Sequence, residues 1–271
     1  MKKELTIVVL FDVVFIFFLA LSGFFNGILE SAVYYLAFIV PIFFAIALAR
    51  KMGISSHAPK IKMNTDGILL TACTAFPLFA LVFFVSWLTS LVLGFFGASS
   101  NATDVSGNII SAIFTHALLT AVCEELLFRY VPITYLAPYS KRVAVLASAL
   151  FFSLVHCNFF QLPYAFIAGV VFAVLDIASD SILPSFLLHF SNNIISVIWV
   201  RGEGRIEFVR IYIIILVSLA VISLIPAYLL RKRYASFVSV AFDKGCLAKG
   251  ELGYSPAVLI LLALTIALVS I

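Results

Sequence analysis

Two adjacent glutamates and an arginine lie in a segment that is otherwise apolar enough for the interior of a membrane. Residues 120–133 read TAVCEELLFRYVPI and include Glu124, Glu125 and Arg129. Glu125 and Arg129 are four residues apart with the acid first, so they can neutralise each other on one helix face. Glu124 lies about 100° around the helix from Glu125 and has no cation three or four residues away. Such a carboxylate suits a general base or acid; purely structural pairing between helices is the alternative reading.

A histidine is predicted at the same depth as Glu124. The segment FFSLVH places Phe152 and His156 four residues apart, on one helix face. A hairpin turn is expected near Ser140, sixteen residues after Glu124 and sixteen before His156. Antiparallel helices would bring both side chains to a depth of roughly 20 Å from the turn. We therefore predict that His156 reaches Glu124.

A third polar cluster lies in the segment LHFSNNI, where His189 and Asn193 are four residues apart. Their N–H groups can point together from one helix face and stabilise a developing oxyanion. The alternative is a hydrogen-bond cluster that joins membrane helices. Asp12, His116 and Asp176 are further ionisable residues inside apolar segments, and the sequence assigns them no role.

A glutamate, a histidine and a His–Asn donor pair are the parts of a peptide hydrolase that activates water directly. Such chemistry needs no serine, cysteine or threonine nucleophile. Two histidines and a glutamate could instead hold a catalytic zinc ion. The chain contains no HExxH sequence, and a zinc ion would occupy groups needed for other roles. We therefore expect no metal and no cofactor, with zinc as the alternative.

The composition requires membrane helices to position these residues. Of the 271 residues, 64% are hydrophobic and 11% charged, with a mean hydropathy of +1.20, whereas soluble domains have about a quarter of their residues charged. We predict one all-α integral membrane domain, residues 1–271, with eight core helices and a ninth candidate. The candidate spans are 5–25, 32–50, 67–97, 108–135, 141–158, 162–178, 182–200, 208–230 and 256–271.

Positive charge is concentrated in alternate loops. If the nine spans alternate in direction, one side of the membrane holds Lys2, Lys3, Arg50, Lys51, Lys60, Lys62, Lys141, Arg142, Arg231, Lys232, Arg233, Lys244 and Lys249. The opposite loops hold Arg201 and Arg205. The positive-inside rule then predicts a multi-pass protein of the cell membrane with a cytoplasmic N-terminus. The net charge of +4 follows from this topology, and no nucleic-acid partner is expected.

The three polar segments resemble the motifs of a known family. EELLFR matches EExxxR, FSLVH matches FxxxH and HFSNN matches HxxxN. In this order they are similar to the family of CAAX proteases and bacteriocin-processing enzymes (CPBP or Abi proteins), which includes the type II CAAX prenyl endopeptidases. The resemblance implies an intramembrane glutamate-dependent endopeptidase whose catalytic core covers about 108–200. It further implies that Glu124 and His156 activate water, that His189 and Asn193 form the oxyanion site, and that Glu125, Arg129 and Phe152 support them.

The resemblance leaves the substrate open. Eukaryotic relatives cut prenylated CAAX tails, and bacterial relatives are linked to peptide maturation, bacteriocin self-immunity and secretion. We expect a membrane-associated peptide or protein as substrate and the lipid bilayer as surroundings. A non-catalytic immunity or scaffold protein and a small proton-coupled transporter with a Glu/His pair are the alternatives.

Overall fold

A computed structural model describes residues 2–54, 56–98, 108–156, 158–202 and 205–242, and within them the chain forms helices and no strand. The long helices are α1 (Lys2–Ser22), α2 (Ile28–Lys51), α3 (Thr65–Phe95), α8 (Leu162–Ser179), α9 (Leu183–Gly202) and α10 (Ile206–Leu229). One continuous helical run consists of α4 (Ile109–Ala112), η1 (Ile113–Leu119), α5 (Thr120–Glu125), η2 (Leu126–Tyr130) and α6 (Val131–Leu136). The remaining helices are α7 (Lys141–Leu154) and α11 (Arg231–Phe242).

The predicted all-α membrane bundle is confirmed. Seven helical stretches of the described residues are long and apolar enough to cross a membrane, and the run 109–136 is one of them. The fifth predicted span, 141–158, corresponds to α7, which has 14 residues and is therefore shorter than the roughly 17 residues that a span needs. The ninth candidate, 256–271, lies outside the described residues.

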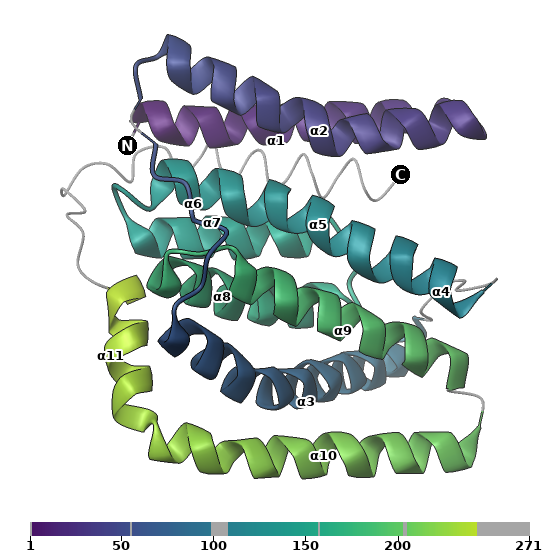
Figure 1. Cartoon of the computed structure of the whole chain (residues 1–271). Helices are drawn as coiled ribbons and strands as arrows, with labels where there is room; N and C mark the ends of the chain where they lie inside the picture. The colour runs from purple at the N-terminus through teal and green to yellow at the C-terminus, as the bar shows by residue number, and fades with distance from the viewer. Residues whose placement is uncertain (1, 55, 99–107, 157, 203–204, 243–271) are drawn as a thin grey trace.

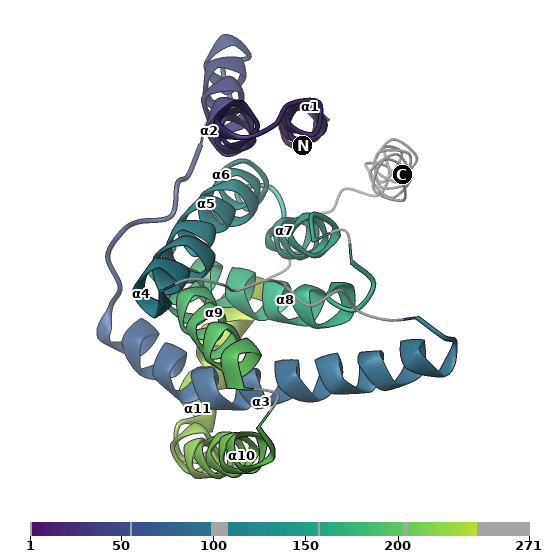
Figure 2. The same cartoon turned by 90° about the vertical axis from the view of Figure 1, so that its right-hand side faces the viewer.

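The helices are stacked in layers. Figures 1 and 2 show α1 and α2 on one side of the bundle, then α5, α6 and α7, then α8 and α9, with α3 and α10 on the far side. The first hairpin is joined to the motif-bearing run by an edge-to-face contact between Phe15 and Phe128, with ring centroids 5.6 Å apart. Both rings belong to the main hydrophobic core, which also contains Phe152. The residues with predicted chemistry therefore lie in the central layers.

Helices α7 and α8 pack closely because Gly169 has no side chain. A Cβ atom at this position would lie 2.9 Å from the Cα atom of Ala149, closer than van der Waals contact allows. Helix α7 begins at a well-defined point, since the Ser140 hydroxyl accepts a hydrogen bond from the Val143 amide as an N-cap. These two features fix the position of the helix that carries Phe152 and His156.

The loop after α2 is anchored to the end of α8. Asp180 accepts a hydrogen bond from His57 at 2.8 Å and pairs with the Lys60 ammonium at 2.7 Å. Partial burial raises the pKa of Asp180, but its hydrogen bonds with Lys60 and His57 outweigh this effect and lower the pKa. The stabilisation is therefore present above the ordinary pKa of aspartate and is lost as the pH falls through the lowered value.

Helix α11 lies within a stretch that the sequence assigned to a cationic loop. It lies across the end of the bundle (Figure 1). The Tyr234 hydroxyl donates to the Leu70 carbonyl at 2.8 Å, and Arg233 pairs with Asp66 at 3.1 Å. The helix was not predicted because membrane-span periodicity ends before it, and these contacts with α3 arise from the tertiary structure.

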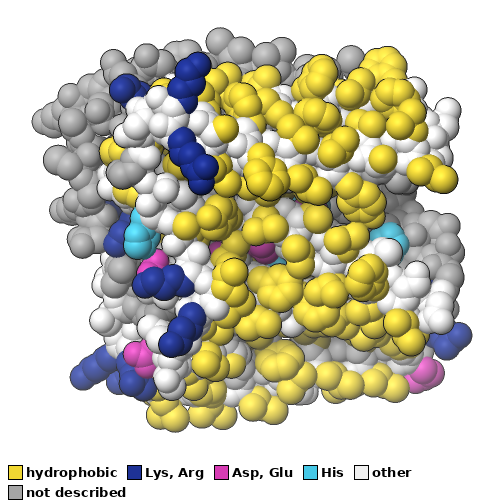
Figure 3. Space-filling model, turned by 45° about the horizontal axis from the view of Figure 1, so that its top comes forward, with side chains coloured by type: hydrophobic (Ala, Val, Ile, Leu, Met, Phe, Trp, Pro, Cys, Tyr) yellow, Lys and Arg dark blue, Asp and Glu magenta, His cyan; other side chains and the backbone are white. Residues whose placement is uncertain are grey.

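The orientation predicted from the loop charges can be tested by labelling. In Figure 3, most of the visible Lys and Arg side chains gather near one end of a surface that is otherwise largely apolar. We propose that this end, with the loop 51–66, faces the cytoplasm. A single cysteine placed in this loop, in a background without the native cysteines, should resist an impermeant maleimide in intact cells and react after lysis. Efficient labelling of intact cells would reverse the orientation.

Candidate active site

Glu124 and Glu125 lie in a short α-helical segment between two π-helical segments. The segment α5 is preceded by η1 and followed by η2, and a hydrogen bond of the wider turn joins the Thr120 hydroxyl to the Thr115 carbonyl at 3.0 Å. π-Helical turns are rare and occur often at functional sites. The two π-helical segments shift the side chains before and after the glutamate pair around the helix, relative to a regular α-helix. The sequence periodicity did not indicate this shift.

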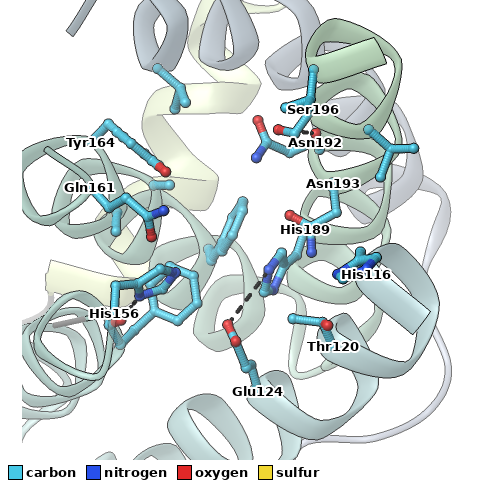
Figure 4. A pocket seen from close by; sticks show the side chains of 17 residues that line it. His116, Thr120, Glu124, His156, Gln161, Tyr164, His189, Asn192, Asn193 and Ser196 are labelled. Carbon is cyan, nitrogen blue, oxygen red and sulfur yellow. Dashed lines mark hydrogen bonds and ion pairs between the residues drawn. The ribbon is translucent and has the colours of Figure 1, made fainter. Parts of the chain in front are cut away.

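Five of the seven predicted site residues line one cavity of about 260 Å³, called here the Glu124 cavity (Figure 4). These five are Glu124, Phe152, His156, His189 and Asn193. They come from α5, from α7 and its C-terminal end, and from α9. The structure thus brings together residues that the sequence distributes over three motifs. Glu125 and Arg129, the remaining two, are buried and are not part of the cavity lining.

His189 lies between the two glutamates. Its Nδ1 atom is 2.7 Å from a Glu125 oxygen, and its Nε2 atom is 3.7 Å from a Glu124 oxygen. Ionised Glu125 can only accept a hydrogen bond, so Nδ1 carries the proton and Nε2 is the atom that faces Glu124. The side chain of His189 is 5% exposed, and its ring stacks on Phe172. Glu125 therefore fixes both the orientation and the tautomer of His189.

Arg129 and Glu125 form the pair that the sequence predicted. The Nε atom of Arg129 lies 3.3 Å from a Glu125 oxygen, and the two side chains are 0% and 2% exposed. The guanidinium also donates to the carbonyl and the hydroxyl of Ser148, at 3.4 and 3.3 Å, and lies 4.3 Å from the centre of the Phe152 ring. Arg129 thus holds Glu125 in place, and Glu125 in turn holds His189, which lines the cavity.

His156 lines the same cavity as Glu124, its hydrogen bond goes back to α7, and its predicted contact with Glu124 stays a prediction. Its Nδ1 atom donates to the Phe152 carbonyl at 2.7 Å, which leaves Nε2 as the acceptor when the ring is neutral. His156 and Glu124 both line the cavity, but among the described residues the ion-pair partner of Glu124 is His189. In Figure 4 the two side chains lie on different walls of the cavity. The expectation that Glu124 has no cationic partner therefore holds only within its own helix.

The cavity is also lined by polar residues to which the sequence analysis gave no part in the reaction. These are His116, Thr120, Gln161, Tyr164, Asn192 and Ser196. His116, Thr120 and Glu124 are spaced four residues apart. This spacing could have identified His116 and Thr120 as neighbours of Glu124 on one helix face. Asn192, Asn193 and Ser196 similarly follow His189 at helical spacing. Gln161 and Tyr164 carry no such signal, because their position depends on how α8 packs.

Asp176 is a second buried carboxylate near this cluster. It is 0% exposed, and one of its oxygens accepts a hydrogen bond from the Ser185 backbone amide at 3.0 Å. Ser185 lies in the first turn of α9, so Asp176 satisfies one of the free amides at this helix start. This contact gives Asp176 a structural role in placing the helix that carries His189.

The side chains that could bind a metal ion are few around the Glu124 cavity. Within the described residues, no group of three or more His, Cys, Asp or Glu side chains is arranged to hold a metal ion. The ring nitrogen Nδ1 of His189 is engaged by Glu125, and Nδ1 of His156 by a carbonyl. These contacts leave Nε2 of both rings available, as in histidines that bind a metal through Nε2, so zinc stays the alternative to the metal-free reading.

Comparison with known proteins gives one match. Residues 106–195 match the family model described as "Type II CAAX prenyl endopeptidase Rce1-like". No curated protein and no solved structure matches the chain. The matched range contains all three motifs and the five predicted site residues that line the Glu124 cavity. The match covers about a third of the chain, and over this range the chain is similar to the type II CAAX prenyl endopeptidases.

Proposed function

We propose that this protein is an intramembrane endopeptidase that cleaves a membrane-associated peptide with a water molecule activated by Glu124. The observation that carries the proposal is the convergence of Glu124, His156, His189 and Asn193 on one cavity. The match to an endopeptidase family supports the reaction class. The apolar helices around the cavity support a substrate that reaches it from the membrane.

The first step is attack of water on the peptide carbonyl. Glu124, with His156 across the cavity, takes a proton from the water as its oxygen forms a bond to the carbonyl carbon. The Nε2 atom of His156 is the ring nitrogen available for this role, since Nδ1 donates to a carbonyl. Both side chains line the same cavity, and the proposed water molecule lies between them.

The second step is stabilisation of the oxyanion and loss of the amine. His189, protonated and held by Glu125, donates from Nε2, and the Asn193 amide donates beside it. A carboxylate that orients a histidine and stabilises its charged form is a recurring device in hydrolases. The C–N bond then breaks, and the proton held by Glu124 or His156 passes to the leaving amine.

The proposal can be tested with purified protein and a chelator. A fluorescently labelled membrane peptide in detergent or nanodiscs should be cleaved, and a strong chelator should leave the rate unchanged. Uptake of protons or solutes into liposomes without cleavage would favour the transporter alternative. Loss of cleavage on chelation, restored by zinc alone, would replace the glutamate reaction with a metal-dependent one.

Removing each donor of the oxyanion pair should lower turnover without unfolding the protein. His189→Ala and Asn193→Ala are each expected to reduce kcat by roughly 100- to 1000-fold, the typical effect of losing an oxyanion donor. Asn192→Ala is the matched comparison, because Asn192 is its neighbour and also lines the cavity. A smaller loss in Asn193→Ala than in Asn192→Ala would move the donor role to Asn192.

A further inference from the structure

A second cavity adjoins the Glu124 cavity on the side of α3 and α10. It measures about 270 Å³ and is called here the aromatic cavity. Its lining consists of Phe79, Val82, Phe83, Ser86, Trp87, Ser90, Tyr164, Asn192, Ile195, Ser196, Trp199 and Tyr212. Four of these residues, Val82, Tyr164, Asn192 and Ser196, also line the Glu124 cavity. The two cavities therefore share a wall, and the proposed reaction does not use the aromatic cavity.

The walls of this cavity are built of packed aromatic rings. The ring centroids of Trp199 and Tyr212 are 4.8 Å apart, those of Phe83 and Trp199 5.1 Å, and those of Phe83 and Tyr212 5.8 Å. These contacts join α3, α9 and α10. Aromatic rings held by one another form a rigid apolar surface, which favours a large apolar group over a polar one.

The shared wall carries polar groups. Tyr164 lies on one side and Asn192 with Ser196 on the other, as Figure 4 shows. The Ser196 hydroxyl donates to the Asn192 carbonyl at 3.0 Å, which leaves the Asn192 side chain and the Tyr164 hydroxyl to meet a ligand. A peptide backbone in apolar surroundings needs hydrogen-bond partners. The shared wall can supply them to a chain that passes from one cavity to the other.

The distance along α9 fits a short extended peptide. The residues of α9 that line the aromatic cavity follow His189 by three to ten positions. At 1.5 Å per residue this is about 5 to 15 Å, the length of roughly two to four extended residues. A space of about 270 Å³ between aromatic rings has room for one large apolar side chain.

On the basis of the proposed function, we propose that the aromatic cavity binds a large apolar side chain of the substrate, two to four residues from the peptide bond that is cut. It would make the enzyme select substrates by this residue. Binding here also holds the chain extended at Glu124, because the side chain and the scissile carbonyl occupy the two adjoining cavities at once.

The two tryptophans of the chain provide a direct measurement of binding. The sequence contains two tryptophans, Trp87 and Trp199, and both line the aromatic cavity. A peptide with one bromophenylalanine should quench their fluorescence in the Glu124→Gln protein, in nanodiscs, when the bromine is two to four residues from the cleavage site. The same peptide with bromine eight residues away should not. Because Trp87 is 54% exposed, lipid is tested on Trp199 alone, in Trp87→Phe; quenching of Trp199 by brominated lipid that the peptide fails to displace would assign the cavity to lipid and overturn the proposal.

Selectivity is measured separately in the active protein. Peptides with Trp or Ala at the critical position are compared in wild type and in Ser86→Phe, which narrows the cavity. We expect kcat/KM in wild type to favour Trp by roughly 10- to 100-fold, and Ser86→Phe to remove most of this preference. Leu91→Phe is the matched control, because Leu91 lies on the same helix, is 55% exposed and does not line the cavity.

The two measurements separate the failure of this inference from that of the proposed function. Site-specific quenching without hydrolysis by wild type would retain the binding site and remove the endopeptidase. Hydrolysis with no positional quenching, and with the same Trp preference in wild type, Ser86→Phe and Leu91→Phe, would retain the endopeptidase and overturn the aromatic cavity as a substrate site.

Discussion

Glu124→Gln should reduce hydrolysis by about 100-fold or more, the scale of a lost general base, while the protein stays folded. Glutamine keeps the size and polarity of the side chain and removes the group that can take a proton. Its side-chain oxygen can still face Nε2 of His189, which lies 3.7 Å from the Glu124 oxygen, so the polar contact in the cavity wall is kept. Cleavage rate and melting temperature of the purified variant provide the measurement.

His156 is expected to act with Glu124 as one unit. His156→Ala should lower turnover to a similar extent, and the double variant should be little worse than either single one, because groups that act together are not additive. Thr120→Ala is a suitable control, since Thr120 lines the same cavity and is given no part in the reaction. Substantial cleavage by pure Glu124→Gln would remove the central claim of the mechanism.

Arg129→Ala should destabilise the fold by about 3 kcal/mol or more, as expected when one partner of a buried ion pair is removed. The change would leave Glu125 buried without its cation and would also remove the contacts of Arg129 with Ser148 and Phe152. Poor expression or a lowered melting temperature should result, and activity should fall as a consequence because Glu125 holds His189.

An exposed ion pair in the same chain serves as the control. Arg210 pairs with Glu207 at 3.3 Å, but the two side chains are 69% and 79% exposed. Arg210→Ala should therefore change the melting temperature little, since exposed pairs contribute little to stability. A variant Arg129→Ala that is as stable as Arg210→Ala but inactive would assign Arg129 to the chemistry instead of the fold.

The sequence was sufficient for the fold class because the requirement is local. A chain with this fraction of apolar residues must satisfy its backbone hydrogen bonds within each span, and helices do so without reference to the rest of the chain. For the same reason the Glu125–Arg129 contact was predictable, since its geometry is set by a spacing of four residues on one helix. Loop charge predicted an orientation on similarly local grounds, and this orientation remains to be tested.

Tertiary structure decided which groups meet across helices. The partner of Glu124 was expected to be His156, from equal depth in a hairpin, but depth does not fix the rotation of a helix about its axis. The hydrogen bond to the Phe152 carbonyl orients the His156 ring, and the side chain of His189 contacts both glutamates.

The sequence by itself determined the membrane-helical class, the three motifs and the residues that carry the proposed chemistry, because each depends on composition or on spacing within one helix. Only the tertiary structure decided that α7 is shorter than a full span, that Asp176 caps α9, and that an aromatic cavity adjoins the Glu124 cavity. These features depend on contacts between residues far apart in the chain, such as Phe83 with Trp199, and no local pattern encodes which helices become neighbours.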